Sequence, residues 1–201
     1  MQSVSPACRR ACCLRATDLA CRRGDRVLFA GVSLALQAGS ACHILGANGI
    51  GKSSLIRILA GLAAPWAGAV ERTGTVGLID DRPALDPHLP LGRALDFWSG
   101  IDENDAGAAE ARLGLADLLD VPVRYLSTGQ RKRAALARLI TQQAPIWLLD
   151  EPLNGLDSAA AELTMALTVE HLQGGGIAIV ASHQPFALTG MTTLDLAEFA
   201  A

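Results

Sequence analysis

The chain has 201 residues, half of them hydrophobic and 18% charged, which is enough apolar material for one folded domain and excludes an intrinsically disordered chain. Its formal net charge of −3 gives no general basis for nucleic-acid binding, and none is expected. The chain contains no run of about 18 purely apolar residues, so we expect no membrane span. No apolar stretch follows the arginines near the N-terminus, so we expect no secretory signal.

Along the chain, short apolar segments alternate with segments of helical spacing. We expect strands at 26–36, 40–46, 146–150 and 176–183, two short strands around a turn within 69–79, and helices at 52–62, within 90–120, from 129 to about 140 and at 159–172. Strands that alternate with helices predict an α/β fold, in which a parallel sheet has helices packed on it.

The same pattern suggests a domain organisation. We expect a loose N-terminal extension at 1–13 and a single domain at 14–201, with a helical subdomain at about 84–142 where acidic helical segments interrupt the strand pattern. The five cysteines lack the spacing of a disulfide framework, which suits a reducing cytoplasm. The cluster of Cys8, Cys12 and Cys13 is compatible with a metal or haem site, or with incidental thiols on the extension.

The segment GANGIGKSS at 46–54 fits the phosphate-loop pattern G-x-x-x-x-G-K-[ST], and it lies between an expected strand and an expected helix, as a P-loop requires. Its glycines let the backbone wrap around phosphates without Cβ clashes. Lys52 would reach the β- and γ-phosphates, and the Ser53 hydroxyl would bind Mg²⁺. We therefore expect ATP to contact Gly46, Ala47, Asn48, Gly49, Ile50, Gly51, Lys52, Ser53 and Ser54.

Acidic residues and a histidine follow two other buried strands. Asp150 ends the strand IWLLD, where it can hold the Mg²⁺ shell, and Glu151 follows it, where a carboxylate can polarise the attacking water. His183 follows the last buried strand, at the sheet edge where α/β proteins bind ligands, so we expect it near the γ-phosphate. His43, His88 and His171 have no motif around them and are interpreted as structural or surface residues.

The segment YLSTGQRKRAALARLI at 125–140 reads as a polar loop followed by a basic helix. Ser127, Thr128 and Gly129 would lie at the helix N-terminus, where unpaired backbone N–H groups favour an anion. An ordinary Ser-capped helix explains the same residues without any ligand.

The order of these motifs resembles that of ATP-binding cassette (ABC) ATPases: a P-loop, Leu-Ser-Thr-Gly-Gln at 126–130, Asp150-Glu151, Leu156-Asp157 and His183. The resemblance covers about residues 14–199. It implies a P-loop NTPase fold with a RecA-like core, a small antiparallel β subdomain and a helical subdomain that contains the signature loop, 126–130. It further implies a head-to-tail dimer with a second cassette, in which Ser127 and the Gly129 N–H cap the γ-phosphate held by the partner, and it adds Gln130 and Asp157 to the nucleotide contacts.

The chain departs from the family pattern at four places. Thr128 replaces the first glycine of the usual LSGGQ, and Asn154-Gly155 precedes Leu156-Asp157 where the family usually has Ser-Ala. No glutamine occurs between Gln37 and Gln130, so the family's Mg²⁺-contacting glutamine is missing, and Asp81 or Arg82 is the expected occupant of the matching loop, 78–87. The usual adenine-stacking aromatic is also missing, and Arg23 near that position is either a stacking guanidinium or a solvated side chain.

The compact single cassette resembles the cytochrome c biogenesis branch of the family, the haem-exporter ATPases, in the segments LFAGVSLAL, SLIRILAGL, DEPLNGLD and SHQP. This resemblance implies an ATPase on the cytoplasmic face of the cell inner membrane, bound peripherally to an integral membrane subunit of the CcmB type. It implies no direct haem binding by the cassette. The energy subunit of another short exporter, of lipid or drug type, and a soluble ABC-type assembly ATPase are the alternatives.

Overall fold

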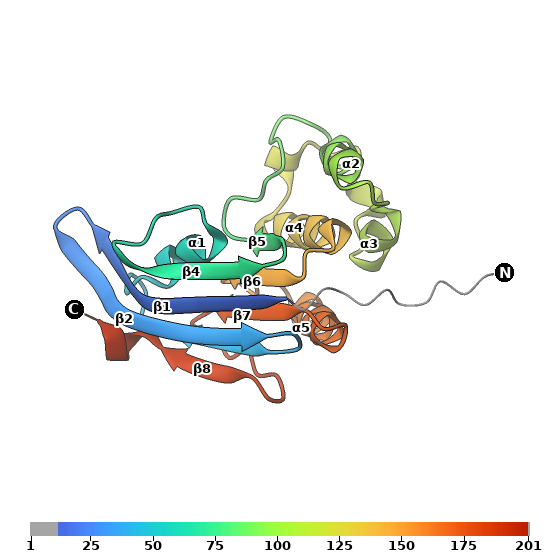
Figure 1. Ribbon diagram of the computed structural model, residues 1–201. Coiled ribbons are helices and arrows are strands. Elements are labelled where there is room, and N and C mark those ends of the chain that lie inside the picture. The colour runs from blue at the N-terminus through green and yellow to red at the C-terminus, as the bar shows by residue number, and fades with distance from the viewer. Residues whose placement is uncertain (1–11, 201) are drawn as a thin grey trace.

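The computed structural model describes residues 12–200, which form two sheets and a group of helices (Figure 1). The strands are β1 (Cys13–Arg23), β2 (Arg26–Gln37), β3 (Ala41–Leu45), β4 (Ala67–Thr73), β5 (Val76–Ile79), β6 (Ile146–Asp150), β7 (Ile177–Ala181) and β8 (Thr192–Asp195). The α-helices are α1 (Lys52–Ala60), α2 (Leu91–Asp102), α3 (Gly107–Arg112), α4 (Thr128–Gln142) and α5 (Ser158–Gln173). Each strand and helix expected from the sequence is present, with ends that differ by a few residues.

The central sheet is parallel and has the strand order β5-β6-β7-β3-β8. Ala181 of β7 pairs with both Ile44 of β3 and Asp150 of β6, so these three strands end at the same level. The P-loop follows β3 and His183 follows β7. The P-loop, Asp150 and His183 therefore meet at the carboxyl edge of one sheet, where α/β proteins bind ligands.

The second sheet is antiparallel, with the order β2-β1-β4, and it confirms the expected β subdomain. The 11-residue strand β1 was not expected from the sequence. Leu14 and Ala16 are buried in alternation, but the register shifts between Ala16 and Leu19, and Asp18 between them has a φ of 49°. This bulge moves the buried side chains from even to odd positions and hides the period-two pattern.

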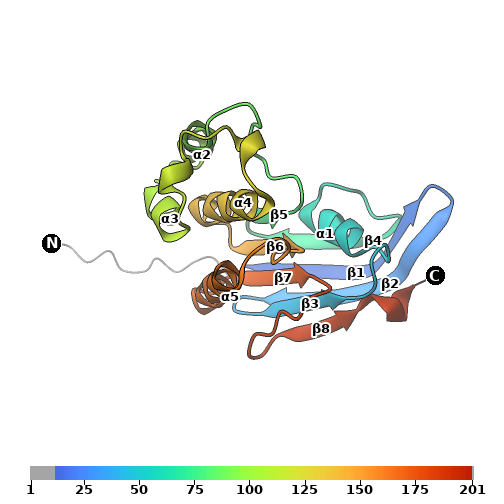
Figure 2. The ribbon, with the colours of Figure 1, turned by 180° about the vertical axis from the view of Figure 1, so that it is seen from behind.

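Two hydrophobic clusters pack on opposite faces of the parallel sheet. One joins α1 and the antiparallel sheet to Leu148 and Ile179, and the other joins α2, α4 and α5 to Leu149 and Val180. Consecutive residues of a strand point to opposite faces, so each central strand is buried on both sides. Figure 2 shows α2, α3 and α4 grouped beside the core, as expected for the helical subdomain.

The predicted extension at 1–13 falls mostly outside the described residues, and so does Cys8. Cys12 is buried and its thiol donates to the Gly175 carbonyl at 3.3 Å, while Cys13 begins β1. Among residues 12–200, no helix has the length and apolar character to cross a membrane.

Candidate nucleotide-binding site

The P-loop backbone adopts conformations that favour glycine. Gly46, Gly49 and Gly51 have φ values of 139°, 81° and 120°. A Cβ on Gly46 would lie 2.9 Å from Ile50 Cγ2, and one on Gly51 would lie 3.0 Å from the Phe29 ring. The loop therefore needs glycine both for its dihedral angles and for its close packing.

The loop leads directly into α1, whose first turn is suited to an anion. Gly51 is the N-cap, no side chain accepts from the first amides, and no acidic residue lies in the first turn. The unpaired N–H groups and the helix dipole therefore face the loop without competition from a carboxylate.

Lys52 is nearly buried, with 5% of its surface exposed. Its ammonium donates to the carbonyls of Gly46 at 2.7 Å and Ala47 at 3.2 Å, and lies 4.0 Å from Glu151 Oε1. The P-loop carbonyls thus hold the Lys52 ammonium close to Glu151, the residue that follows β6.

Asp150 has the properties of a cation ligand. It is buried, its Oδ1 has no hydrogen-bond partner among the described residues, and burial raises the pKa of its carboxyl, with a hydrogen bond from Ser53 acting in the opposite direction. A buried carboxylate oxygen without a partner is costly unless it binds a cation. A carboxylate and a hydroxyl are the hard oxygen ligands that Mg²⁺ prefers, so these residues fit that ion.

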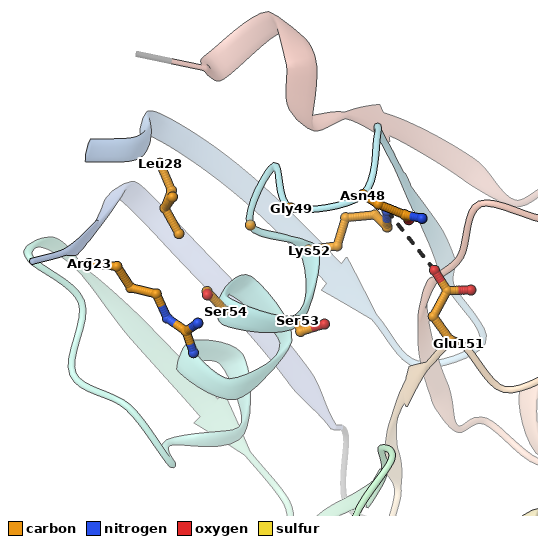
Figure 3. Close-up of a pocket in the computed structure, with 9 residues that line it drawn as sticks. Arg23, Leu28, Asn48, Gly49, Lys52, Ser53, Ser54 and Glu151 are labelled. Carbon is orange, nitrogen blue, oxygen red and sulfur yellow. Dashed lines mark ion pairs between the residues drawn. The ribbon is translucent and has the colours of Figure 1, made fainter. Parts of the chain in front are cut away.

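Glu151 is fixed by its backbone and by three donors. Its φ is 48°, a rare value for a residue with a Cβ, and its N–H donates to the Ala181 carbonyl at 2.7 Å. Glu151 Oε2 lies 3.3 Å from Ser182 Oγ, 3.4 Å from the His183 N–H and 2.9 Å from His183 Nδ1. The other oxygen, Oε1, is on the Lys52 side (Figure 3). Only Oε1 is therefore left to accept a proton from a water molecule.

A cavity of about 280 Å³ runs between these groups and the antiparallel sheet. Lys52 and Glu151 lie at one end and Arg23 and Leu28 at the other, with Ser54 between them (Figure 3). Arg23 therefore lies where the sequence placed a candidate for base stacking. Leu28 was not anticipated, because one apolar residue within a strand pattern carries no ligand signal.

The signature residues of the same chain do not line this cavity. Ser127 caps α4: its hydroxyl accepts from the Gln130 N–H at 3.2 Å, and Gln130 Oε1 accepts from the Ser127 N–H at 2.7 Å. Asp157 caps α5 in the same way, through the Ala160 N–H at 2.8 Å. The structure therefore shows the local capping contacts of Ser127, and it does not bring Ser127 to the P-loop cavity of its own chain.

The comparisons with known proteins agree with this geometry. The sequence model of the ABC transporter family matches residues 29–154. The cytochrome c biogenesis ATP-binding export protein CcmA of Novosphingobium aromaticivorans is 61% identical, over 94% of this chain and 97% of that one. This chain belongs to the ABC transporter family, among the CcmA proteins. The CcmA protein of Zymomonas mobilis is 49% identical, over 92% of this chain and 84% of that one.

A solved structure supports the assignment to the ABC family. The cbiO1 protein of Clostridium perfringens, part of the ABC transporter complex cbiONQ, is 25% identical and superposes with a TM-score of 0.67, over 85% of this chain and 78% of that one. The expected fold class, a P-loop NTPase of the ABC type, is confirmed.

The loop that lacks the family glutamine is tied to both neighbouring helices. Asp80 binds Arg57 of α1 at 3.3 Å, and Asp81 lies 3.5 Å from the ammonium of Lys132 on α4. The Arg82 N–H donates to Asp80 Oδ1 at 2.8 Å, and the Arg82 side chain is exposed. Of the two candidates, Asp81 is the one whose carboxylate pairs with a buried group, the ammonium of Lys132. Lys132 was missed because a lysine on a basic helix reads as a solvated residue.

Proposed function

We propose that this chain is the ATP-hydrolysing subunit of a membrane transport complex for c-type cytochrome biogenesis. The observation that supports it most directly is the meeting of Lys52, Asp150 and Glu151 at one sheet edge beside a glycine loop. The names of the similar CcmA proteins supply the biological process. In this proposal the cassette binds peripherally, on the cytoplasmic face of the inner membrane, to a CcmB-like membrane subunit, and it does not itself bind haem.

The proposed mechanism begins with phosphate binding. The P-loop amides and the N-terminus of α1 hold the phosphates, and Lys52 exchanges its carbonyl partners, Gly46 and Ala47, for phosphate oxygens. Ser53 and Asp150 would hold Mg²⁺, which neutralises phosphate charge when bound.

Hydrolysis then depends on Glu151. Oε1 accepts a proton from the attacking water, while His183 and Ser182 hold Oε2 and so fix the carboxylate plane. We propose that the signature loop of a second copy, through Ser127 and the Gly129 N–H, closes the site over the γ-phosphate. ATP binding would thereby bring two cassettes together, and hydrolysis would release them.

The test compares wild-type protein with Glu151→Gln, which removes the base with almost no change in shape. We expect ATP binding to persist, hydrolysis to fall about 10²–10⁴-fold, and an ATP-dependent dimer to accumulate in size-exclusion chromatography. Glu162→Gln, on the exposed surface of α5, is the matched control and should behave as wild type. Unchanged turnover in Glu151→Gln would remove Glu151 from this role.

A second experiment addresses the process. In cells that lack the gene, haem staining should show no c-type cytochromes, and wild-type protein but not Glu151→Gln should restore them. Normal c-type cytochromes in the deletion strain would overturn the assignment to cytochrome c biogenesis and leave the ATPase proposal to the first test.

A further inference from the structure

Lys132 is the one cation among the buried residues of α4, the helix that follows the signature loop. The buried residues of α4 are otherwise small or apolar: Ala134, Ala135, Leu136, Ala137, Leu139 and Thr141. Lys132 belongs to this set, with 7% of its surface exposed. A buried ammonium is costly unless it is paired and hydrogen-bonded, so its contacts indicate why it is there.

Those contacts join three parts of the site. The Lys132 ammonium donates to the Asp150 carbonyl at 3.4 Å, at the end of β6, and lies 3.5 Å from Asp81 Oδ1. The adjacent Asp80 binds Arg57 on α1, the helix that begins with the P-loop lysine. One short loop is therefore fastened to the P-loop helix on one side and, through Lys132, to the signature helix and the Asp150 strand end on the other.

This arrangement is a weak source of stability. The Asp81 side chain is 84% exposed, so water screens the ion pair, and both ammonium contacts are long. Replacing a buried ion pair with a well-packed apolar side chain is often neutral or stabilising. Packing alone therefore gives no reason for a lysine at this position.

We infer that Lys132 is a positioning residue that holds the strand end of Asp150 and Glu151 in register with the signature helix and with the 80–82 loop. Lys132 does not line the cavity beside the P-loop. Lys132 acts through the main chain of Asp150. A displacement of the 80–82 loop or of the helical subdomain would therefore move Asp150, the residue that would bind Mg²⁺ in the same chain. This inference rests on the proposed function, because it concerns how the ATPase site is aligned.

The experiment uses four variants of the full chain. Lys132→Met keeps the length of the side chain and removes its charge, and Lys132→Arg keeps the charge. Asp81→Asn removes the partner charge from an exposed side chain and cannot disturb the core. Arg133→Met is the matched control, because Arg133 is the next cation on α4 and donates only to the carbonyls of Leu113 and Gly114.

Three quantities are measured for each variant: the midpoint of thermal unfolding without nucleotide, the affinity for a fluorescent ATP analogue with and without Mg²⁺, and steady-state hydrolysis. Lys132→Met should unfold within about 4 °C of wild type, a change of about 1 kcal/mol for a domain of this size. It should bind the nucleotide normally without Mg²⁺. Its Mg²⁺-dependent gain in affinity and its turnover should fall about 10–100-fold, as is typical when a residue that supports a metal ligand is lost.

The other variants separate positioning from packing. Lys132→Arg should retain most of the activity. Asp81→Asn should lower turnover and the Mg²⁺-dependent gain in affinity about two- to fivefold, which is the effect of an exposed ion pair worth up to about 1 kcal/mol. Asp81→Asn should have no additional effect in the Lys132→Met background, because both changes break the same link. Arg133→Met should leave Mg²⁺ dependence unchanged.

Two results would overturn the inference: a Lys132→Met protein with normal Mg²⁺ dependence and turnover, or one whose losses follow a large drop in unfolding temperature. Failure of the wild-type protein to hydrolyse ATP would instead count against the proposed function. In that case the Mg²⁺-dependent binding of the analogue, which needs no turnover, still decides whether Lys132 positions Asp150 for Mg²⁺ binding.

Discussion

Thr128 and Gly155 depart from the ABC consensus in the signature loop and in the loop before α5, and the two residues lie against each other. A Cβ on Gly155 would lie 2.9 Å from Thr128 Cγ2 and 3.2 Å from Thr128 Cβ. Threonine is stiff at χ1, so its methyl group cannot move away freely. Threonine at position 128 therefore requires glycine at position 155. We predict that Thr128→Gly partly restores the stability that Gly155→Ala removes.

The size of the effect has two parts. Gly155 has a φ of 78°, and an alanine in this left-handed conformation costs about 1–2 kcal/mol. The contact with Thr128 adds about 1–3 kcal/mol of overpacking. At about 2–4 °C per kcal/mol for a domain of this size, Gly155→Ala should lower the unfolding midpoint by about 4–20 °C. Thr128→Gly should restore about 2–12 °C of that loss, because it relieves the contact and leaves the backbone cost.

Thermal unfolding followed by circular dichroism measures both singles and the double variant. Gly190→Ala is the matched control, because Gly190 has the same φ of 78° and no atom within 4 Å of a built Cβ. It should show the backbone cost alone, about 2–8 °C. The reasoning is refuted if the effects of Gly155→Ala and Thr128→Gly simply add, or if Gly190→Ala is as destabilising as Gly155→Ala.

Three further predictions concern the nucleotide site. Lys52→Ala and Ser127→Arg chains, each inactive alone, should regain ATP-dependent dimerisation when mixed, because one of the two shared sites in the mixed dimer is then intact. Size-exclusion chromatography of the mixture measures this dimer. The absence of any rescue would contradict the assignment of Ser127 to the partner's site. Asp150→Asn should unfold at the same or a higher temperature than wild type at pH 7 without Mg²⁺. Burial raises the pKa of Asp150, so its charged form opposes folding above that pKa, and the difference should vanish as the pH falls and the wild-type carboxyl protonates. Arg23→Ala should weaken ATP binding about two- to fivefold in nucleotide titrations if the guanidinium stacks on the base, whereas Arg22→Ala, whose guanidinium lies over Trp66, should not.

The residues that the sequence identified most readily are those whose chemistry needs fixed spacing along the chain. The P-loop works through consecutive amides and one lysine, so its whole pattern lies within 46–54. Asp150 ends a five-residue strand that is buried throughout and Glu151 follows it, and such a strand is visible as an apolar run.

Two residues that act through contacts distant in sequence were missed. Ser182 supports Glu151 across 31 positions, and Lys132 meets Asp81 from another element. Neither was assigned a role from the sequence, because a serine or a lysine alone does not indicate a buried contact. Strand β1 was missed for a local reason, the bulge at Asp18, which breaks the alternation that a strand prediction depends on.

The capped start of α4 shows that the local and the intermolecular interpretations of the signature loop are compatible. The capping box uses a lone pair of the Ser127 hydroxyl and the Gln130 side chain, and it leaves the hydroxyl proton without an acceptor among residues 12–200. The N–H groups of Thr128 and Gly129 lie in the first turn, where a helix offers them no internal acceptor. Capping therefore holds the Ser127 oxygen and the two N–H groups in place, while the hydroxyl proton can still rotate toward an acceptor. These three donors at the positive end of a helix dipole suit a phosphate, and the chain's own cavity has no signature residue in its lining. The site that these donors complete is thus expected to be that of a second cassette.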